Sequence, residues 1–309
     1  MVDRAAMAYR AGSRIAQAIP ERAVGPLANA LGRGAAKLGG DRRRIVESTL
    51  ARVYGRQLGD GLSAKVDATF ASYATYWLQS FRLPTMSRAE VDDGFREVGF
   101  EHIRAAVEDP DTPGPILALP HLGGWEWAAF WLTLIHGYKL TAVVERISSD
   151  ELFDWFVSYR RSLGMNIVPL GPEVTTEVVS ALRDNHVVCL LADRDLEQNG
   201  IAVEFFGEQT TLPGGPAILA LRTGASLIPT VCYLDDRGEG VSAIAGPPLD
   251  TERRAGFRED VERVTQDLAA AFEVQIRRAP EQWHLMQPNW PSDFAMLKSE
   301  ANRSRRRSR

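Results

Sequence analysis

A histidine and a carboxylate stand five positions apart in segment 120–126, whose sequence is PHLGGWE. An imidazole with a pKa of about 6.5 can take a proton from an alcohol at neutral pH, and a carboxylate on its other nitrogen stabilises the imidazolium that forms. Glycines at 123 and 124 permit a tight turn between His121 and Glu126. The spacing predicts a general base, His121, supported by Glu126. A solvated loop histidine followed by an ordinary first-turn glutamate is the alternative interpretation.

The elements on either side indicate where His121 lies. Residues 116–119 form a short apolar run closed by Pro120, which is typical of a buried strand. Residues 125–135 are apolar over a helical length. We therefore expect His121 on a loop between the carboxyl end of a strand and the start of a helix, where open α/β sheets place ligands and where backbone amides favour negative charge.

Further charged residues follow other predicted strands. They are Arg146 after strand 140–144, Arg160 a little later, and Asp193, Arg194 and Asp195 after strand 187–192. Arginines at strand ends can bind phosphates in a bidentate manner, whereas structural ion pairs are the alternative. Either aspartate offers a second carboxylate near His121, and a surface turn is the alternative for both. A third cluster, residues 205–216, ends in glycines before Pro216, which suits the first position of a helix running to Thr223; these glycines either admit an anion or form only a tight connection.

The whole chain alternates between strand and helix patterns from residue 115 onward. Predicted strands cover 116–119, 140–144, 167–170, 187–192, 203–206, 227–234 and 241–245. The last two, separated by DDRGEG, indicate an antiparallel hairpin, and a charged helix follows at about 257–278. This alternation predicts an α/β fold, with a central, mostly parallel mixed sheet flanked by helices.

The amino-terminal 85 residues instead carry helical patterns. We expect breaks at Pro20, Pro26, the glycine pair 39–40 and residues 59–61, and an aromatic-rich amphipathic segment at 70–81. The sequence thus predicts a single domain over residues 1–300, of which 1–85 form a helical layer, followed by a basic disordered tail at 301–309.

Charge is unevenly distributed along the 309 residues. The net charge is −4, yet residues 1–60 hold eleven Lys and Arg against five Asp and Glu, and the tail after Glu300 holds five arginines. Basic ends are either solvated surface or a contact for an anionic membrane or nucleic acid, but no nucleic-acid motif accompanies them. The longest uncharged apolar stretch, 127–135, is far too short for a bilayer, and residues 1–20 lack the apolar core of a signal peptide. Any membrane contact is expected to be peripheral.

Familiar cofactor and catalytic signatures are absent. The chain has no G-x-S-x-G, P-loop, H-E-x-x-H or paired C-x-x-C motif, and its five histidines share no metal-ligand spacing. The segment 32–34 lacks the third glycine of a dinucleotide site. Cys189 and Cys232 each lie in an apolar run, as small core residues in a reducing compartment do. We expect no metal and no cofactor.

Taken in order, these motifs resemble the bacterial lipid A acyltransferase superfamily, and within it the actinobacterial phosphatidylinositol mannoside acyltransferases. The resemblance covers nearly the whole chain except the arginine tail. Many members have Asp where this chain has Glu126, which keeps the charge and lengthens the side chain. The residues that carry the resemblance are His121 to Glu126, Glu145-Arg146, Tyr159-Arg160, Asp193-Arg194-Asp195, Phe205-Phe206-Gly207, and 212–216 through 223–225, supported by 18–22, 72–77, 81–84 and 283–288.

This resemblance implies a glycerolipid acyltransferase-like fold and transfer of a fatty acyl group from acyl-CoA, a co-substrate, to the 6-hydroxyl of a mannose on phosphatidylinositol mannoside. It further implies a monomer, peripheral at the cytoplasmic face of the plasma membrane, that contacts an anionic lipid surface and no nucleic acid. Another glycolipid or phospholipid acceptor, a hydrolase and a lipid-binding scaffold are the alternatives.

Roles follow for individual residues. We expect His121 to deprotonate the hydroxyl, with Glu126 or Asp195 as its carboxylate partner. Asp193 is placed among the substrate-binding residues, although the pair 193/195 is also open as the partner. The amides of Gly123 and Gly124 are expected to hold the oxyanion. For the phosphates of CoA or of the inositol lipid we expect Arg146, Arg160 and Arg194, and for an acyl slot, or else core packing, Trp125, Trp127, Phe130 and Trp131.

Overall fold

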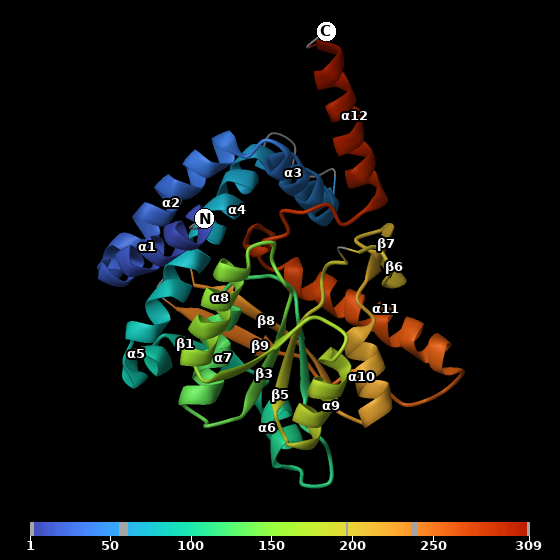
Figure 1. The fold of residues 1–309 in the computed structure, drawn as a ribbon. Helices are drawn as coiled ribbons and strands as arrows, with labels where there is room; N and C mark the ends of the chain where they lie inside the picture. Colours follow the sequence, from blue (N-terminus) through green and yellow to red (C-terminus); the bar gives the residue numbers. More distant parts are fainter. Residues whose placement is uncertain (1–2, 56–60, 196, 236–239, 308–309) are drawn as a thin grey trace.

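The computed structural model of the chain describes residues 3–55, 61–195, 197–235 and 240–307. Its amino-terminal part is a layer of helices above the sheet, as predicted (Figure 1). The helices of this part are α1 (Arg4–Ala18), α2 (Glu21–Leu38), α3 (Asp41–Tyr54) and α4 (Leu62–Arg82), followed by the 3-10 turn η2 (Leu83–Thr85) and α5 (Arg88–Asp93).

The predicted break at Pro26 is wrong, because α2 continues through it. Pro26 costs the helix the bond that its nitrogen would donate one turn back. Packing against α4 offsets this loss: Gly32 lies so close that a β-carbon there would stand 2.4 Å from the Cα atom of Ala71. Gly32, the first glycine of segment 32–34, therefore allows α2 and α4 to pack closely. Of the predicted break at 59–61, residues 59 and 60 lie outside the described residues.

A seven-stranded sheet forms the centre, in the order β1-β9-β8-β2-β5-β3-β4. The pairs β2/β5, β2/β8, β3/β5, β3/β4 and β1/β9 are parallel, whereas β8 and β9 are antiparallel. This confirms both the mostly parallel mixed sheet and the predicted hairpin. The strands are β1 (Phe95–Val98), β2 (Ile116–Leu119), β3 (Leu140–Val144), β4 (Met165–Pro169), β5 (Val187–Leu191), β8 (Leu227–Leu234) and β9 (Val241–Ala245).

Two features of the strands differ from the prediction. Strand β1 was not predicted, since its sequence FREV has charges at two of four positions and its residues are largely exposed at the sheet edge. The predicted strand 203–206 does not join the main sheet. Instead, β6 (Ile201–Phe205) pairs with β7 (Glu208–Leu212) in a separate hairpin. Phe206 and Gly207, with φ of 53° and 74°, form the two-residue turn that matches the strand twist.

Helices cover both faces of the sheet. Alternate side chains of β2 separate into two cores: Leu117 and Leu119 pack in one, Ile116 and Ala118 in the other. The first core contains α6 (Phe100–Glu108), α7 (Trp125–Leu134) and α8 (Asp150–Ser162), and the second contains α9 (Val174–Arg183), α10 (Gly215–Thr223) and α11 (Phe257–Ile276). Figure 1 shows α9, α10 and α11 gathered on one side of the molecule.

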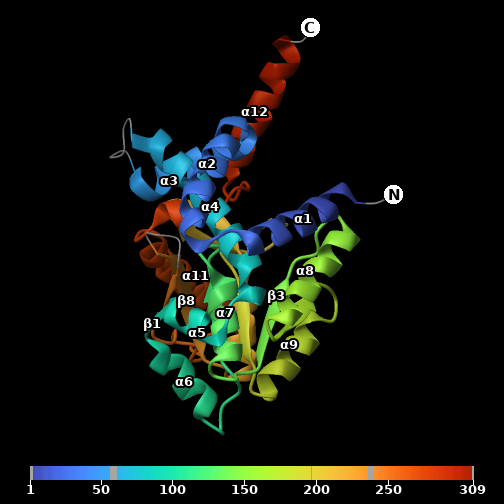
Figure 2. The same cartoon turned by 90° about the vertical axis from the view of Figure 1, so that its left-hand side faces the viewer.

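The carboxyl-terminal segment passes the carboxyl ends of β2 and β5, where its backbone and side chains bond to residues 121 and 193, and it ends in a helix. After the 3-10 turn η3 (Pro280–Gln282), α12 (Pro291–Arg307) extends away from the other helices (Figure 2). The tail 301–309, predicted to be disordered, thus continues this helix as far as Arg307; residues 308 and 309 lie outside the described part. Within the described ranges, no helix is long and apolar enough to cross a membrane.

Candidate active site

His121 lies where the sequence predicts, on the loop between β2 and α7 at the carboxyl end of the sheet. A segment far along the chain holds this loop in place. The backbone N–H of His284 donates to the carbonyl of His121 at 2.8 Å, and Gly123 donates to the carbonyl of Gln282 at 3.2 Å. Leu122 and Trp283 form the antiparallel bridge between these two bonds. The loop is thereby fixed as part of a short two-stranded contact.

Asp193 is the carboxylate that meets His121. Its Oδ1 lies 2.5 Å from Nδ1 of the ring, and its Oδ2 accepts the indole N–H of Trp283 at 2.6 Å. Asp193 follows β5, which lies beside β2, and Ala192 donates its N–H to the carbonyl of Leu119. Neighbouring parallel strands therefore bring the two side chains to one edge. Asp193 is fully buried, whereas the His121 side chain is 23% exposed.

The charge of Asp193 determines which nitrogen of the neutral His121 ring carries the proton. Burial alone raises the pKa of Asp193, but His121, the Trp283 indole and Arg194 together lower it to about 2. The carboxylate is therefore ionised at neutral pH and can only accept a hydrogen bond. The neutral ring must carry its proton on Nδ1, which leaves the lone pair of Nε2 as the proton acceptor.

Glu126 does not make the predicted contact. It is buried, and among the described residues its Oε1 accepts from the Tyr76 hydroxyl at 2.8 Å and from Nη2 of Arg160 at 3.0 Å. Because α7 begins at Trp125, Glu126 lies in the first helical turn and faces α4 and α8 instead of the preceding loop. Burial and the nearby Glu126 charge raise the pKa of Tyr76 well above its usual range, so Tyr76 remains a donor.

Arg160 belongs to this buried group. Its guanidinium pairs with Glu126 and lies over the rings of Trp125 and Phe156, 5.1 and 5.6 Å from their centroids. Although burial lowers the pKa of Arg160, Glu126 raises it further, so the guanidinium stays charged. The ion pair occupies Nη2 of this guanidinium, and the phosphate contact of Arg160 stays a prediction.

Asp195 also has a different role from the one predicted. Its Oδ2 accepts from the N–H of Gly200 and the hydroxyl of Thr211, both at 2.7 Å, and its own N–H donates to Asn289. The side chain thus joins the hairpin β6/β7 to the sheet edge. Since the chain has left β5 at Leu191, Asp193 and Asp195 face different neighbours, and Asp193 is the partner of His121.

Of the other two predicted arginines, one is paired and one is open. Arg194 donates to Gln287 at 2.6 Å and to Glu145 at 3.3 Å. Arg146 is exposed, with its guanidinium 5.3 Å from the ring centroid of Phe153. Arg146 is thus the more accessible cation at this edge.

Of the glycines at 123 and 124, the first is required by the path of the backbone. Gly123 has a φ of +61°, and a β-carbon there would stand 1.7 Å from the carbonyl oxygen of Cys232. No other residue fits this position. The N–H of Gly123 is bonded to Gln282, so the predicted oxyanion role is not available to it. Gly124 precedes the first residue of α7, and its oxyanion role stays a prediction.

Sequence reasoning missed the residues that complete the site. Trp283 holds Asp193, and Tyr76 holds Glu126. The ring of His284 meets the Ser72 hydroxyl at 2.9 Å, and burial and the nearby His121 lower the pKa of His284 to about 3, so it stays neutral. The segments 72–77 and 283–288 support the resemblance, and the density of tyrosine, tryptophan and histidine in them is the available signal.

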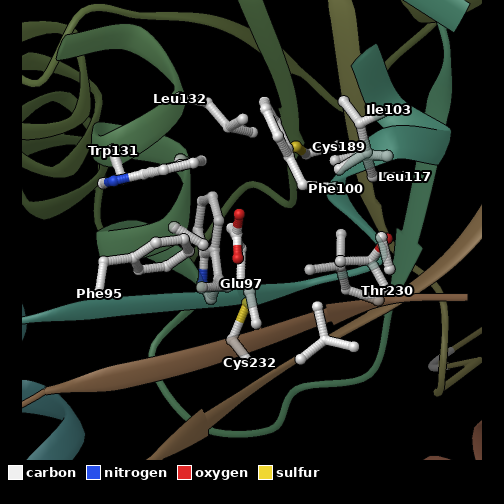
Figure 3. A pocket seen from close by; sticks show the side chains of 17 residues that line it. Phe95, Glu97, Phe100, Ile103, Leu117, Trp131, Leu132, Cys189, Thr230 and Cys232 are labelled. Carbon is white, nitrogen blue, oxygen red and sulfur yellow. The ribbon is translucent and has the colours of Figure 1, made fainter. Parts of the chain in front are cut away.

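An apolar cavity opens between α7 and the sheet (Figure 3). Its empty volume is about 470 Å³, part of which is open solvent at the mouth. Of the four aromatic residues predicted for an acyl slot, Trp125 and Trp131 line it, whereas Trp127 and Phe130 pack in the core. Strands β2, β5, β8 and β9 contribute Leu117, Leu119, Cys189, Thr230, Cys232, Ala243 and Ala245, and the edge strand β1 contributes Phe95, Glu97 and Val98.

Comparison with known proteins places this geometry in a family. The model of the family described as bacterial lipid A biosynthesis acyltransferase matches residues 3–292. The chain belongs to this family. Among its relatives, a phosphatidylinositol mannoside acyltransferase of Mycolicibacterium smegmatis is 38% identical over 94% of this chain and 92% of its own length. Another of that name, from Mycobacterium tuberculosis, is 40% identical over 98% of this chain and 92% of its own.

Family membership makes acyl transfer the chemistry that the site must serve. The lipid A acyltransferase match spans the His121 loop, the Asp193 edge, and the segment 282–289 that joins them. An imidazole whose second nitrogen meets an ionised carboxylate is an arrangement that can deprotonate a hydroxyl, and His121 and Asp193 form such a pair.

Proposed function

We propose that this acyltransferase moves a fatty acyl group from acyl-CoA to a mannose hydroxyl, the 6-hydroxyl, of phosphatidylinositol mannoside. The names of its relatives support the acceptor. The observation that carries the mechanism is the Asp193–His121 contact at 2.5 Å, because it fixes the tautomer that leaves Nε2 ready to accept a proton.

The reaction then needs one base and one oxyanion donor. His121 Nε2 takes the proton as the mannose oxygen forms its bond to the thioester carbonyl carbon, and the carbonyl becomes an oxyanion. When the oxyanion collapses, the C–S bond breaks and CoA leaves as a thiolate, which accepts the proton from His121. Asp193 stabilises the transient imidazolium throughout. The N–H of Gly124, at the positive end of α7, is our candidate for the oxyanion donor, a role usually worth about 3 kcal/mol.

The cavity beside α7 is the proposed slot for the acyl chain. Leu119 and Trp125 line it, and they stand on either side of the His121 loop. A chain that enters there keeps its thioester near the base while its methylenes leave water, each contributing about 0.8 kcal/mol. Burial raises the pKa of Cys189 to about 12, so this cavity thiol stays protonated and inert.

Phosphate groups of CoA or of the inositol lipid are assigned to the exposed Arg146, with Arg194 beside it. Guanidinium groups suit phosphates because their donors form a planar fork. Arg160 stays a prediction for this set, and its Nη2 is paired with Glu126.

The amino-terminal helices are the proposed contact with an anionic membrane, at its cytoplasmic face. Four large apolar side chains on α1 and α2 are exposed, among them Leu38 at 89%. Exposed arginines stand on the same two helices, at 10, 14, 22 and 33. Apolar groups that enter the interface together with cations that meet anionic headgroups are the two requirements for peripheral binding.

Hydrolysis of the thioester is the second candidate, because the partial exposure of His121 admits water as well as a sugar hydroxyl. Incubating the protein with palmitoyl-CoA, with and without phosphatidylinositol mannosides, separates the two. We expect thiol release and a new acylated lipid only when the acceptor is present. Thiol released equally without the acceptor supports the hydrolase, and turnover only with another glycolipid corrects the acceptor.

A further inference from the structure

One charged side chain, Glu97, lines the otherwise apolar cavity. Glu97 belongs to β1, the edge strand of the sheet, and is exposed. Figure 3 shows its carboxylate directed into the cavity, and the rings of Phe95, Trp131 and Phe100 surround the same space. Val98 beside it is 58% exposed, so this end of the cavity meets solvent.

The strand order places Glu97 at the end of the cavity away from His121. His121 follows β2, and β8 and β9 lie between β2 and β1. Three strand spacings of about 4.8 Å make this crossing roughly 14 Å. Extended methylenes advance about 1.3 Å per carbon, given a C–C bond of about 1.5 Å, so roughly 11 carbons cover the crossing. The two residue steps from Leu119 to His121 add up to roughly 7 Å, or about five carbons.

The binding free energy that each added methylene contributes should therefore end where the acyl chain reaches Glu97. Each methylene that enters the cavity should improve binding about fourfold, which corresponds to about 0.8 kcal/mol. A methylene that reaches Glu97 either strips water from an ionised carboxylate or extends into solvent, and it gains nothing. We propose that Glu97 sets the longest acyl chain that the enzyme uses efficiently, at roughly 11 to 16 carbons. This inference rests on the acyl transfer proposed above.

Measuring kcat/KM for saturated acyl-CoAs of increasing even chain length tests the role of Glu97. For the unchanged protein we expect kcat/KM to rise with length, then level or fall. In Glu97→Leu the optimum should move to a chain at least two carbons longer, while the shortest substrates keep their kcat/KM. Glu97→Gln removes the charge with little change of shape, and we expect it to shift the optimum in the same direction. Glu101→Leu, an exposed residue of α6 outside the cavity lining, is the matched control.

The outcomes separate this inference from the proposed function. An unchanged optimum in both Glu97 variants, with transfer intact in the unchanged protein, overturns the role of Glu97 and leaves the transferase standing. A shift that Glu101→Leu reproduces also overturns it. Because thiol release reports every acyl-CoA consumed, the length profile can be measured even if the acceptor proves to be different. A protein that consumes no acyl-CoA overturns both.

Discussion

The indole N–H of Trp283 donates to the oxygen of Asp193 that faces away from His121, at 2.6 Å. The two oxygens of this buried carboxylate therefore have separate tasks: one is held by the indole and the other holds the ring. Because an indole nitrogen can only donate, position 193 must present an acceptor on that side. The orientation of Asp193, and through it the tautomer of His121, depends on a residue that contacts no reacting atom.

Trp283→Phe should show this dependence. The ring remains to fill the core, but Asp193 loses a donor and its pKa rises. An unpaired buried acceptor costs about 1 to 3 kcal/mol, so we expect a lower free energy of unfolding by this amount in denaturant titrations, together with a reduced kcat. A variant with unchanged stability and unchanged kcat would show that the indole bond has no role.

His284 should make the protein sensitive to acid. Its pKa is lowered to about 3, so between pH 6.5 and 3 the unfolded chain binds a proton that the folded state rejects. The contribution of His284 to stability is complete above pH 6.5 and is lost as pH falls toward 3, by up to about 5 kcal/mol. We expect His284→Gln to flatten the profile of unfolding free energy against pH in this window. The same slope in both proteins would assign the acid sensitivity elsewhere.

The ion pair of Glu126 and Arg160 should behave as a buried pair. Removing one member leaves an uncompensated charge, so Glu126→Gln or Arg160→Met alone should lower the unfolding free energy by about 3 to 5 kcal/mol. The double variant should lose less than the sum of the two, since no charge remains unpaired. Additive losses in this double-mutant cycle would mean that the two side chains act separately.

Membrane contact is tested by flotation with vesicles. We expect the protein to float with vesicles that contain anionic lipid, and the bound fraction to fall severalfold in Leu31→Asp/Leu38→Asp. Val274→Asp, which changes an exposed apolar residue of α11, serves as the matched control. Binding that is independent of anionic lipid would refute the proposed contact.

Much of this architecture could be predicted from local patterns. Apolar runs located β2, β3, β8 and β9, and the closing Pro120 located His121 at the carboxyl end of a strand. By contrast, β1 carries two charges in four residues and gives no such pattern. Local patterns report burial, and an exposed edge strand has little of it.

Local patterns offered Glu126, Asp193 and Asp195 as partners of His121 and could not choose among them, for a different reason. Glu126 is close in sequence, but the phase of α7 turns it toward Arg160. Asp193 is 72 residues away and arrives because β5 lies beside β2, an order that no periodicity encodes. Trp283 comes from an irregular segment still further along the chain. The contact between His121, Asp193 and Trp283 depends on the strand order and on the path of that segment, and neither follows from a local pattern.

The most direct test of the central claim is acceptor-dependent acyl transfer by Asp193→Asn. Because Trp283 demands an acceptor, the new amide must turn its oxygen to the indole and its NH₂ to Nδ1 of His121, which forces the ring proton onto Nε2 and abolishes the base. We predict that kcat falls by about three to four orders of magnitude. Adding Trp283→Phe should let the amide reverse and recover part of the rate, whereas the exposed control Asp184→Asn should change nothing. An Asp193→Asn protein that is folded and keeps more than about a tenth of the kcat would contradict the account, since a tautomer fixed by Asp193 predicts a loss of about 10³ to 10⁴.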